Sequence, residues 1–423
     1  MASDANEGRD TGSEGYRRAE RYVVEQFEKL GLKPAGEKGY AQPVALHSVE
    51  LDAGATTVDL VREGKPERLR FLEEVAITAG VGLPESIEAP VVLADKAGTD
   101  VKGKFAVVHA AGRGPALAKA GALGVLTIDN PRTTEPPRWP VAYAKVVRLA
   151  PLAESSFFNI RLSEGAAEKV LRRPASLRIR TKTLTKELVA DNLIAALPGE
   201  QDEYVVVSAH LDGYGIGYPV NGDRIYNGAF DDCAYVATLL EFAAHLKEGG
   251  QKLKRGILFV VVTGEEKGLL GSAYFTAHPT VRKEKLVADI NLDYLRPIFP
   301  LRALTVLALD QSTLGPVAAR VAESMGIRVQ PDNEPERGLF RRGDQFNFLK
   351  IGVPALAFIF GYEKGSAEEK VYRSWYMDRY HKPSDDLNQP IDFGAAVKFN
   401  QFFEKLVVEV ANSPGRPRML KRS

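Results

Sequence analysis

From Asn192 onward, short apolar segments alternate with amphipathic ones, and this alternation limits the possible folds more than any other feature of the chain. The apolar segments have the composition of buried strands and lie at 192–197, 204–209, 257–262, 287–292, 305–309 and 354–360. The segments between them predict helices at 233–247, 266–277, 314–325 and 344–350, and a last helix is predicted near 393–411. Buried strands that alternate with helices are typical of an α/β domain with a largely parallel sheet.

The first half of the chain has a different texture. Residues 1–13 are small and polar, so we expect them to be disordered. A helix is predicted from Glu14, because an apolar stripe follows it and Gly31 supplies a stop signal. Between 51 and 187, short β-rich runs are separated by turn residues, with one helix at 115–120 and the Pro-rich loop 130–140 among them. This pattern indicates a separate β-rich domain.

Composition excludes several classes of protein. A chain of 423 residues favours two domains, and 56 Lys and Arg against 55 Asp and Glu give no positive excess for nucleic acid or an anionic membrane. The single cysteine, Cys233, excludes an internal disulfide and a cysteine-based zinc cluster. The longest apolar runs, such as 257–262, are too short to span a bilayer. The polar N-terminus lacks the apolar region of a signal peptide, so we expect either an intracellular protein or one whose leader has been removed.

Familiar catalytic motifs are missing or incomplete. The segment at 98–105, GTDVKGKF, nearly matches a phosphate-binding loop, but it lacks the final Ser or Thr and precedes a predicted strand. The chain contains neither a G-x-S-x-G elbow nor an H-E-x-x-H pair. Nucleotide-binding, serine hydrolase and single-helix zinc protease functions therefore have no support from the sequence.

Five segments each place a potential metal ligand directly after a predicted strand or in a loop. The residues are His210, Asp231, Glu265 with Glu266, Asp293 and His381. Open α/β sheets bind ligands at the carboxyl ends of their strands, so these segments can converge in one crevice. Imidazoles mixed with carboxylates suit zinc, with manganese or cobalt as substitutes, and one shared carboxylate allows two ions about 3.5–4 Å apart.

Each of these residues also has an ordinary structural explanation. His210 alone is typical of a hydrogen-bonded histidine at a strand end, and a lone Glu-Glu pair is typical of a solvated face. Asp231 and Asp232 can simply cap the helix that follows them. The metal interpretation depends on the joint order of the segments and on their position after apolar strands.

The segments SAHLD, GAFDD, VVTGEE, INLD and RYHKPSD, in this order, resemble the co-catalytic dizinc aminopeptidase family. That family includes bacterial leucyl aminopeptidases and the glutamate carboxypeptidase branch. The segment RRGDQFNFLKIGVPAL is also similar, although Gly343 stands where a serine is common. The resemblance covers 14–50 and 188–412, which it identifies as a discontinuous catalytic domain followed by a tail at 413–423. Residues 51–187 resemble an inserted protease-associated domain.

The resemblance implies a three-layer α/β zinc-exopeptidase fold with a mixed, mostly parallel central sheet and a β-rich protease-associated insert. It implies two zinc ions per chain, with Asp231 bridging them and Glu265 as the general base. It also implies that Asp212 orients His210, and that Asp232 follows Asp231 through an unusual peptide geometry. The other ligands divide between the two ions, with His210 and Asp293 on one and Glu266 and His381 on the other.

The function that the resemblance implies is an aminopeptidase acting on peptides with a free N-terminus, with no nucleic-acid or membrane partner. A glutamate-carboxypeptidase-like enzyme, a glutaminyl-cyclase-like enzyme with a single zinc, and a receptor-like homologue that has lost its metals are the alternatives. Retention of the whole ligand set argues against the last two. A secreted or periplasmic location, with the leader absent, is expected, and a cytoplasmic one stays open.

Other conspicuous residues are expected to be structural. His245 lies within a predicted helix and His278 lies in a loop before Pro279, so neither is expected to bind a metal. Cys233 is expected to be a small packed residue. Arg341 and Arg342 can contact a substrate carboxylate, but a solvated surface is the preferred interpretation. The loops around Tyr294 and 360–362 are expected to shape the specificity pocket.

Overall fold

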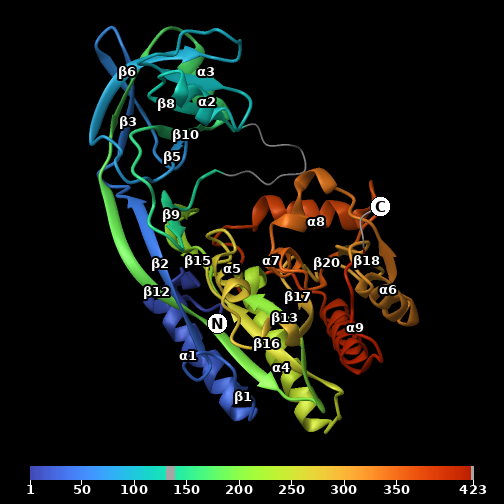
Figure 1. Ribbon diagram of the computed structural model, residues 1–423. Helices are drawn as coiled ribbons and strands as arrows, with labels where there is room; N and C mark the ends of the chain where they lie inside the picture. Colours follow the sequence, from blue (N-terminus) through green and yellow to red (C-terminus); the bar gives the residue numbers. More distant parts are fainter. Residues whose placement is uncertain (130–138, 421–423) are drawn as a thin grey trace. The chain divides into compact units, whose positions relative to one another are not determined.

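The computed structural model describes residues 1–129 and 139–420. The chain divides into two compact units (Figure 1). The α/β unit comprises Met1–Val44, Val189–Ile216 and Asp223–Ser423, and the β-rich unit comprises Ala45–Leu188 and Gly217–Gly222. Most of the expected Pro-rich loop, at 130–138, and the last three residues of the expected tail lie outside the described residues.

The central sheet of the α/β unit is mixed, with a parallel centre, as the alternation of strands and helices predicts. Its strands run in the order β19-β18-β20-β17-β13-β16-β12. Strand β13 is parallel to both β16 and β17, β17 is parallel to β20, and β12 is antiparallel to β16. The strands are β12 (Thr183–Leu197), β13 (Gln201–His210), β16 (Arg255–Val262), β17 (Leu286–Asn291), β18 (Ala303–Leu307), β19 (Arg328–Gln330) and β20 (Ala355–Phe360).

Helices cover both faces of this sheet. In β16, Phe259 contacts Phe242 of α4, and Phe242 contacts Phe403 of α9. Neighbouring β16 residues of the opposite face, Leu258 and Val260, belong to the cluster that includes side chains of α5 and α7. Successive side chains of a strand point to opposite faces, so the unit has three layers. The helices are α1 (Glu14–Lys29), α4 (Ala234–Glu248), α5 (Leu270–Ala277), α6 (Leu314–Ser324), α7 (Gln345–Lys350), α8 (Ala367–Asp378) and α9 (Phe393–Asn412).

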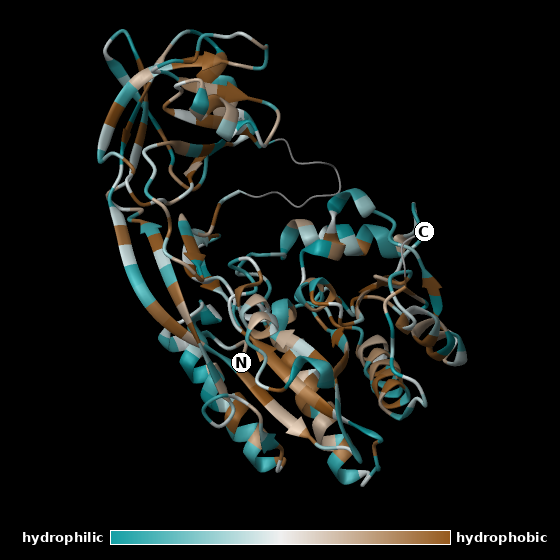
Figure 2. Ribbon diagram, in the orientation of Figure 1, coloured by the Kyte–Doolittle hydropathy of each residue, from teal (hydrophilic) through white to brown (hydrophobic). Residues whose placement is uncertain are grey.

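The inner strands of this sheet are buried along their whole length and consist mainly of apolar residues. Every residue of β16, β17 and β20 is buried, and Figure 2 shows these strands coloured mainly as hydrophobic. A sheet that is covered on both faces needs apolar side chains in both directions, which gives continuous apolar runs rather than alternation. This is why the strands could be recognised from the sequence.

The β-rich unit contains an eight-stranded sheet in the order β4-β3-β11-β6-β7-β8-β10-β5. Its strands are β3 (Thr57–Arg62), β4 (Lys65–Leu69), β5 (Val75–Ile77), β6 (Ser86–Leu93), β7 (Phe105–Val108), β8 (Gly124–Ile128), β10 (Phe158–Leu162) and β11 (Ser176–Arg180). Two helices, α2 (Gly114–Lys119) and α3 (Glu164–Leu171), accompany it. The expected boundaries were 51 and 187, whereas the compact unit covers 45–188 and also takes in 217–222. Its identity as a protease-associated domain stays a prediction.

The remaining strands are short or cross between the units along the chain. Strands β2 (Ala41–Leu51) and β12 each begin in one unit and end in the other, and β9 (Lys145–Arg148) pairs with the end of β2. Strand β1 (Lys33–Pro34) pairs with β12, and β14 (Gly215–Val220) pairs with β15 (Asp223–Tyr226). No helix in residues 1–129 or 139–420 combines the length and the hydropathy that a membrane span requires.

The structure differs from the sequence-based expectation at the N-terminus and at helices α3 and α8, neither of which was predicted. Residues 1–13 are ordered, not disordered: Asp4–Arg9 form the short 3-10 helix η1, and Arg9 is completely buried. Their polar composition suggested disorder, but these side chains hydrogen-bond to the rest of the unit. Helix α8 was not predicted, because the loop-like segment before His381 carries no clear apolar stripe.

Candidate metal centre

The predicted ligands meet at one edge of the central sheet. His210 is the last residue of β13, Asp293 follows β17 by two residues, and Glu265 and Glu266 follow β16 by three and four. Because β13 lies between β16 and β17 and is parallel to both, the three strands end on the same side. Asp231 lies in η2 (Ala229–Cys233), the π-helical turn before α4, and His381 follows α8.

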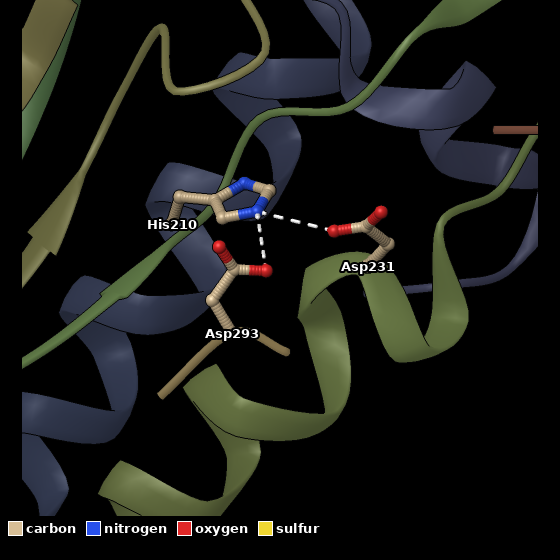
Figure 3. Close-up of side chains that lie close together, drawn as sticks. All are labelled: His210, Asp231 and Asp293. Atoms are coloured by element: carbon tan, nitrogen blue, oxygen red, sulfur yellow. Dashed lines mark ion pairs between the residues drawn. The ribbon is translucent and has the colours of Figure 1, made fainter. Parts of the chain in front are cut away.

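Three of these side chains form the group that we call the inner group: His210, Asp231 and Asp293 (Figure 3). His210 Nε2 lies 3.4 Å from Asp231 Oδ1 and 4.0 Å from Asp293 Oδ1. All three side chains are buried, with exposed side-chain fractions of 1% for His210, 6% for Asp231 and 8% for Asp293. The inner group is thus a buried cluster of one imidazole and two carboxylates.

Asp231, Glu266 and His381 form a second group, the outer group. His381 Nε2 lies 3.3 Å from Asp231 Oδ2 and 3.5 Å from Glu266 Oε2. Within each group the candidate ligand atoms lie within 4.8 Å of one another. Asp231 belongs to both groups and offers one oxygen to each, which is the arrangement expected of a bridging carboxylate.

Three buried polar atoms of the two groups lack hydrogen-bond partners among the described residues. Among the described residues, His210 Nε2, Asp231 Oδ2 and Glu266 Oε1 are buried and accept or donate no hydrogen bond. Buried polar atoms normally have partners, because an unsatisfied one costs about 1–3 kcal/mol of stability. Unsatisfied imidazole and carboxylate atoms that face one another fit a divalent cation with mixed nitrogen and oxygen ligands.

The pKa values of the acidic side chains also indicate a site that suits cations. Burial, together with the nearby carboxylate of Asp231, raises the pKa of Asp293 to about 7. Burial and neighbouring carboxylates also raise the pKa of Glu265 well above its ordinary value. Burial opposes ionisation of Asp231 too, but the contacts with His210 and His381 hold its pKa well below its ordinary value. Cations among these groups would remove the repulsion that keeps protons on them.

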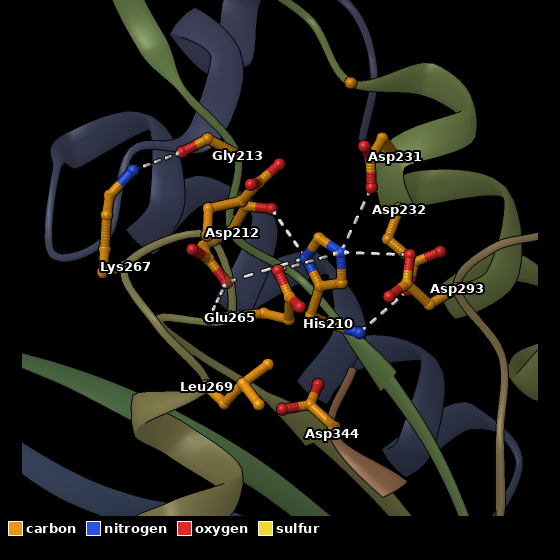
Figure 4. A network of polar contacts seen from close by, with 12 residues as sticks. His210, Asp212, Gly213, Asp231, Asp232, Glu265, Lys267, Leu269, Asp293 and Asp344 are labelled. Carbon is orange, nitrogen blue, oxygen red and sulfur yellow. Dashed lines mark hydrogen bonds and ion pairs between the residues drawn. The ribbon is translucent and has the colours of Figure 1, made fainter. Parts of the chain in front are cut away.

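Both the backbone and the ring of His210 are held by neighbouring residues. Its backbone N–H donates to Asp232 Oδ2 at 2.9 Å, and its Nδ1 lies 3.1 Å from the carbonyl oxygen of Asp212 (Figure 4). The Asp212 carboxylate is farther from Nδ1, at 3.7 Å, and accepts instead from the backbone N–H of Glu265 at 3.0 Å. Asp212 therefore contacts His210 mainly through its main chain, and its carboxylate fixes Glu265.

The turn that carries Asp231 is fixed by two residues that the sequence analysis gave no role. The Asp385 carboxylate accepts hydrogen bonds from the backbone N–H groups of Phe230 and Asp231, at 2.9 and 3.1 Å. Arg296, completely buried, lies with Nη2 3.5 Å from Asp231 Oδ2 and stacks on Trp375. The peptide bond between Asp231 and Asp232 is cis, the unusual geometry that the family resemblance implies. Asp385 is the final residue of the quoted RYHKPSD segment, whereas Arg296 had no sequence signal.

His381 lies in the loop after α8, whereas His210 lies at the end of a strand. Its backbone φ is +55°, and its Nδ1 lies 2.9 Å from the Tyr214 hydroxyl. Its ring stacks on Tyr380 with a centroid distance of 3.6 Å. Metal-binding histidines are generally oriented through the ring nitrogen that does not face the metal, and Tyr214 occupies that position here.

The N-terminal segment supports the loop between His210 and Asp231. Buried Arg9 donates from Nε to the carbonyl oxygen of Leu211 at 2.8 Å, and from Nη1 and Nη2 to those of Asn227 and Gly228 at 2.5 and 3.1 Å. Thr11 donates to Asp212 Oδ2 at 3.0 Å. One guanidinium thus ties together both ends of the loop that joins the ligands. Nothing in the composition of residues 1–13 indicated this role.

A pocket of about 450 Å³ opens over the two groups. It is lined by Tyr214, Asp231, Glu265, Glu266, Gly268, Leu269, Asp293, Tyr294, Arg341, Arg342, Tyr380 and His381. Tyr294 was expected there. Arg341 and Arg342 are exposed, as the solvated-surface interpretation expects, and they also line this pocket.

The residues expected to be structural lie away from both groups. His245 is half exposed and pairs with Glu404, with Nδ1 2.7 Å from Oε1. His278 stacks against Tyr274 at the end of α5. Cys233 is buried at the start of α4 and is not in either group.

Comparison with known proteins gives a family match over the region that carries the site. The model of peptidase family M28 matches residues 192–407, just over half of the 423-residue chain. This range contains every residue of the inner and outer groups, and it excludes almost all of the β-rich unit.

Curated relatives match shorter segments. A vacuolar membrane protease of Tuber melanosporum is 34% identical over 110 residues, which cover 24% of this chain and 10% of that protein. Carboxypeptidase Q of Xenopus laevis is 28% identical over 167 residues, covering 38% of this chain and 32% of that protein. The matches thus span no more than about a third of these relatives' own length.

Solved structures match nearly the whole chain at low identity. The zinc aminopeptidase BSAP of Bacillus subtilis has a TM-score of 0.64 at 18% identity and covers 97% of this chain and 94% of its own. A peptidase M28 precursor of Shewanella amazonensis SB2B has a TM-score of 0.66 at 20% identity and covers 99% and 93%. At this identity the likeness establishes the fold, and it includes the β-rich unit.

Proposed function

Because the chain belongs to peptidase family M28 and is therefore a peptide hydrolase, we propose that it is a zinc-dependent aminopeptidase with two metal ions per chain. The observation that carries the proposal is the pair of ligand groups that share Asp231. The names of the matched zinc aminopeptidase structures support the choice of metal and of reaction. The substrate would be a peptide with a free N-terminus.

The residues divide naturally between two ions. His210 and Asp293 would hold one ion, Glu266 and His381 the other, and Asp231 would contact both with its two oxygens. Each ion would have three protein ligands, which leaves coordination positions open as in catalytic zinc sites. Bound zinc would polarise the scissile carbonyl and lower the pKa of a water to about 7.

We assign the proton transfer to Glu265. Its carboxylate lies in the pocket, 4.0 Å from His210 Nε2, and its backbone N–H is held by Asp212. A carboxylate at this position can take a proton from a water molecule and pass it to the leaving amine. The tyrosines that line the pocket would exclude bulk water around this transfer.

A single variant tests this proposal. Glu265→Gln should keep close to two zinc ions per chain, because Glu265 is in neither group, while kcat on leucyl-p-nitroanilide falls at least about 1,000-fold. Metal content would be measured by mass spectrometry on the same preparations. Glu368→Gln, which changes a partly exposed glutamate of α8 outside the pocket, is the matched control. Normal turnover by Glu265→Gln, or full activity of metal-free wild type, would overturn the proposal.

A carboxypeptidase is the second candidate, because Arg341 and Arg342 line the pocket and arginine binds carboxylates well. Cleavage of N-blocked peptides at their C-terminal residue, without cleavage of leucyl-p-nitroanilide, would favour it. A single bound zinc would instead favour a glutaminyl-cyclase-like enzyme. The secreted or periplasmic location stays a prediction, which cell fractionation would test.

A further inference from the structure

Two arginines share a pocket with four acidic side chains. Arg341 and Arg342 are both exposed residues and both line the cavity over the metal-ligand groups. The carboxylates that line the same cavity are those of Asp231, Glu265, Glu266 and Asp293. Two divalent cations would balance these four negative charges, so the arginines would leave the loaded pocket with an excess of positive charge.

The segment that carries the arginines is held in place. Leu339–Arg341 form the 3-10 helix η5, and the Arg342 backbone N–H donates to the carbonyl oxygen of Leu339 at 3.0 Å. The Tyr294 hydroxyl donates to the same carbonyl oxygen at 3.2 Å, which ties the segment to the residue after Asp293. The guanidinium groups thus extend from a fixed backbone, and this lowers the entropic cost of binding a ligand.

Gly343 makes this arrangement possible. A Cβ at this position would lie 2.4 Å from the Tyr294 hydroxyl oxygen and 2.5 Å from Gln345 Oε1, which is closer than atoms can approach. The glycine that replaces the serine common in the family therefore lets Tyr294 pack directly against the arginine segment. The close contact between Tyr294 and the segment that carries the arginines thus depends on the glycine at position 343.

The guanidinium of Arg341 has no partner in the described part of the chain. Within residues 1–129 and 139–420, its guanidinium makes no ion pair and no side-chain hydrogen bond. A guanidinium matches a carboxylate in geometry and binds it through two parallel hydrogen bonds. Two adjacent arginines in a cavity that opens over the reacting centre therefore select an anionic group of the substrate.

We infer that Arg341 and Arg342 form a carboxylate-binding subsite and that the preferred substrates are short peptides whose carboxylate lies close to the scissile bond. This inference rests on the proposed peptidase function of the same pocket. The carboxylate can be the free C-terminus of a dipeptide or an acidic side chain, since both present the same group. The cavity volume of about 450 Å³ lies within the range of small-molecule sites rather than of an extended groove.

Matched peptides distinguish the sources of the carboxylate. Hydrolysis of Leu-Gly would be compared with that of Leu-Gly-amide, which lacks the carboxylate, and with Leu-Asp-amide and Glu-Gly-amide, which carry it on a side chain. We expect kcat/KM for at least one of the three carboxylate peptides to exceed that for Leu-Gly-amide by about tenfold or more. The carboxylate peptide with the largest kcat/KM relative to Leu-Gly-amide shows whether the C-terminus or a side chain supplies the carboxylate. Equal kcat/KM values for all four peptides in the wild type would overturn the inference.

Variants assign the preference to the arginines. In Arg341→Met/Arg342→Met the ratio of kcat/KM for the preferred carboxylate peptide to that for Leu-Gly-amide should fall to about one. Arg302→Met is the control, because Arg302 is a highly exposed arginine of the same unit outside this pocket. A ratio that survives in the double variant would also overturn the inference.

Binding separates this inference from the proposed function. Calorimetry would measure dissociation constants of all four peptides for Glu265→Gln, with and without the two arginine substitutions. An arginine-dependent preference for a carboxylate peptide, together with no hydrolysis of any of the four by the wild type, would sustain the subsite and overturn the peptidase proposal. Equal affinities of all four peptides, together with their hydrolysis by the wild type, would sustain the peptidase proposal and overturn the subsite.

Discussion

The inner and outer groups share Asp231 but are built differently. The inner group stands on the ends of adjacent parallel strands, and the exposed fraction of its histidine side chain is 1%. The outer group stands on the turn after β16 and on the loop after α8, and 27% of the His381 side chain is exposed. Strand ends are fixed by the sheet, whereas loop residues need supports of their own, here Tyr214 and Tyr380. We therefore expect the inner group to bind its ion more tightly and to matter more for stability.

The largest effect is expected at Asp231, because it belongs to both groups. Asp231→Asn should remove ligands from both groups, so kcat/KM on leucyl-p-nitroanilide should fall at least about 10,000-fold and both ions should be lost. Metal analysis by mass spectrometry checks the loss. Asp100→Asn, an exposed carboxylate of the β-rich unit, is the control. Retention of one tightly bound ion would mean that Asp231 does not bridge.

Single histidine variants compare the two groups directly. His210→Ala leaves buried carboxylates without their partner, so it should lower the free energy of unfolding by about 3–5 kcal/mol, and His381→Ala by less than about 2 kcal/mol. Each should retain about one ion. Denaturant unfolding and metal analysis would be done in parallel. Equal destabilisation by the two variants would contradict the difference that burial predicts.

Without metal ions, the free energy of unfolding should depend on the protonation of Asp293 in the inner group. In metal-free protein the folded-state pKa of Asp293 is about 7, above its unfolded value of about 4, so folding binds a proton. Its stabilising contribution is present below about pH 4 and is lost as the pH rises through 7. The free energy of unfolding should therefore fall by about 3 kcal/mol between pH 5 and 8.

Two comparisons isolate this effect of Asp293. The fall with pH should be much smaller in zinc-loaded protein and in metal-free Asp293→Asn, as followed by thermal unfolding. His381 belongs to the more exposed outer group, and metal-free His381→Ala should therefore keep the fall. A metal-free protein whose stability rises from pH 5 to 8 would mean that the inner carboxylates are not held in mutual repulsion.

The Arg9 contacts test how far the inner group depends on its loop. Arg9→Met leaves the carbonyl oxygens of Leu211, Asn227 and Gly228 without their donor, so the apparent zinc affinity should fall about 10–100-fold. Competition with a chelator measures it. Thr11→Val, which removes only the hydrogen bond to Asp212, should have a smaller effect and separates loss of the loop tie from loss of folding. Unchanged affinity in a folded Arg9→Met protein would remove Arg9 from the supports of the site.

The smallest effect is expected at Tyr214, which supports only the outer group. Tyr214→Phe removes the hydroxyl near His381 Nδ1 and keeps the ring, so affinity for the weaker ion should fall about threefold to tenfold. The visible spectrum of the cobalt-substituted protein reports the change in one site. Tyr22→Phe, an exposed tyrosine of α1, is the control. A spectral change in the tightly bound ion instead would assign Tyr214 to the inner group.

Much of the α/β unit could be predicted because its strands are buried on both faces. The apolar runs predicted at 257–262 and 354–360 coincide with β16 and β20, and the helix predicted from Glu14 is α1. Its mixed, mostly parallel sheet was expected as well. Helix α8 was missed, since its buried residues Tyr372, Trp375 and Tyr376 are aromatic and most of its other positions are polar.

The sequence by itself determined which side chains could form the site, because ligands that follow strands of a parallel sheet must share one edge. The family resemblance implied how these side chains divide, and the tertiary structure adds the geometry, with Asp231 Oδ1 near His210 and Oδ2 near His381. The tertiary structure alone decided the supports: Arg9 and Asp385 lie more than 150 positions in the chain from residues whose carbonyl or N–H groups they bind. Such contacts depend on the path of the folded chain. No local pattern of polarity or propensity encodes them, and for this reason a polar N-terminus that looked disordered proved to be part of the metal centre's framework.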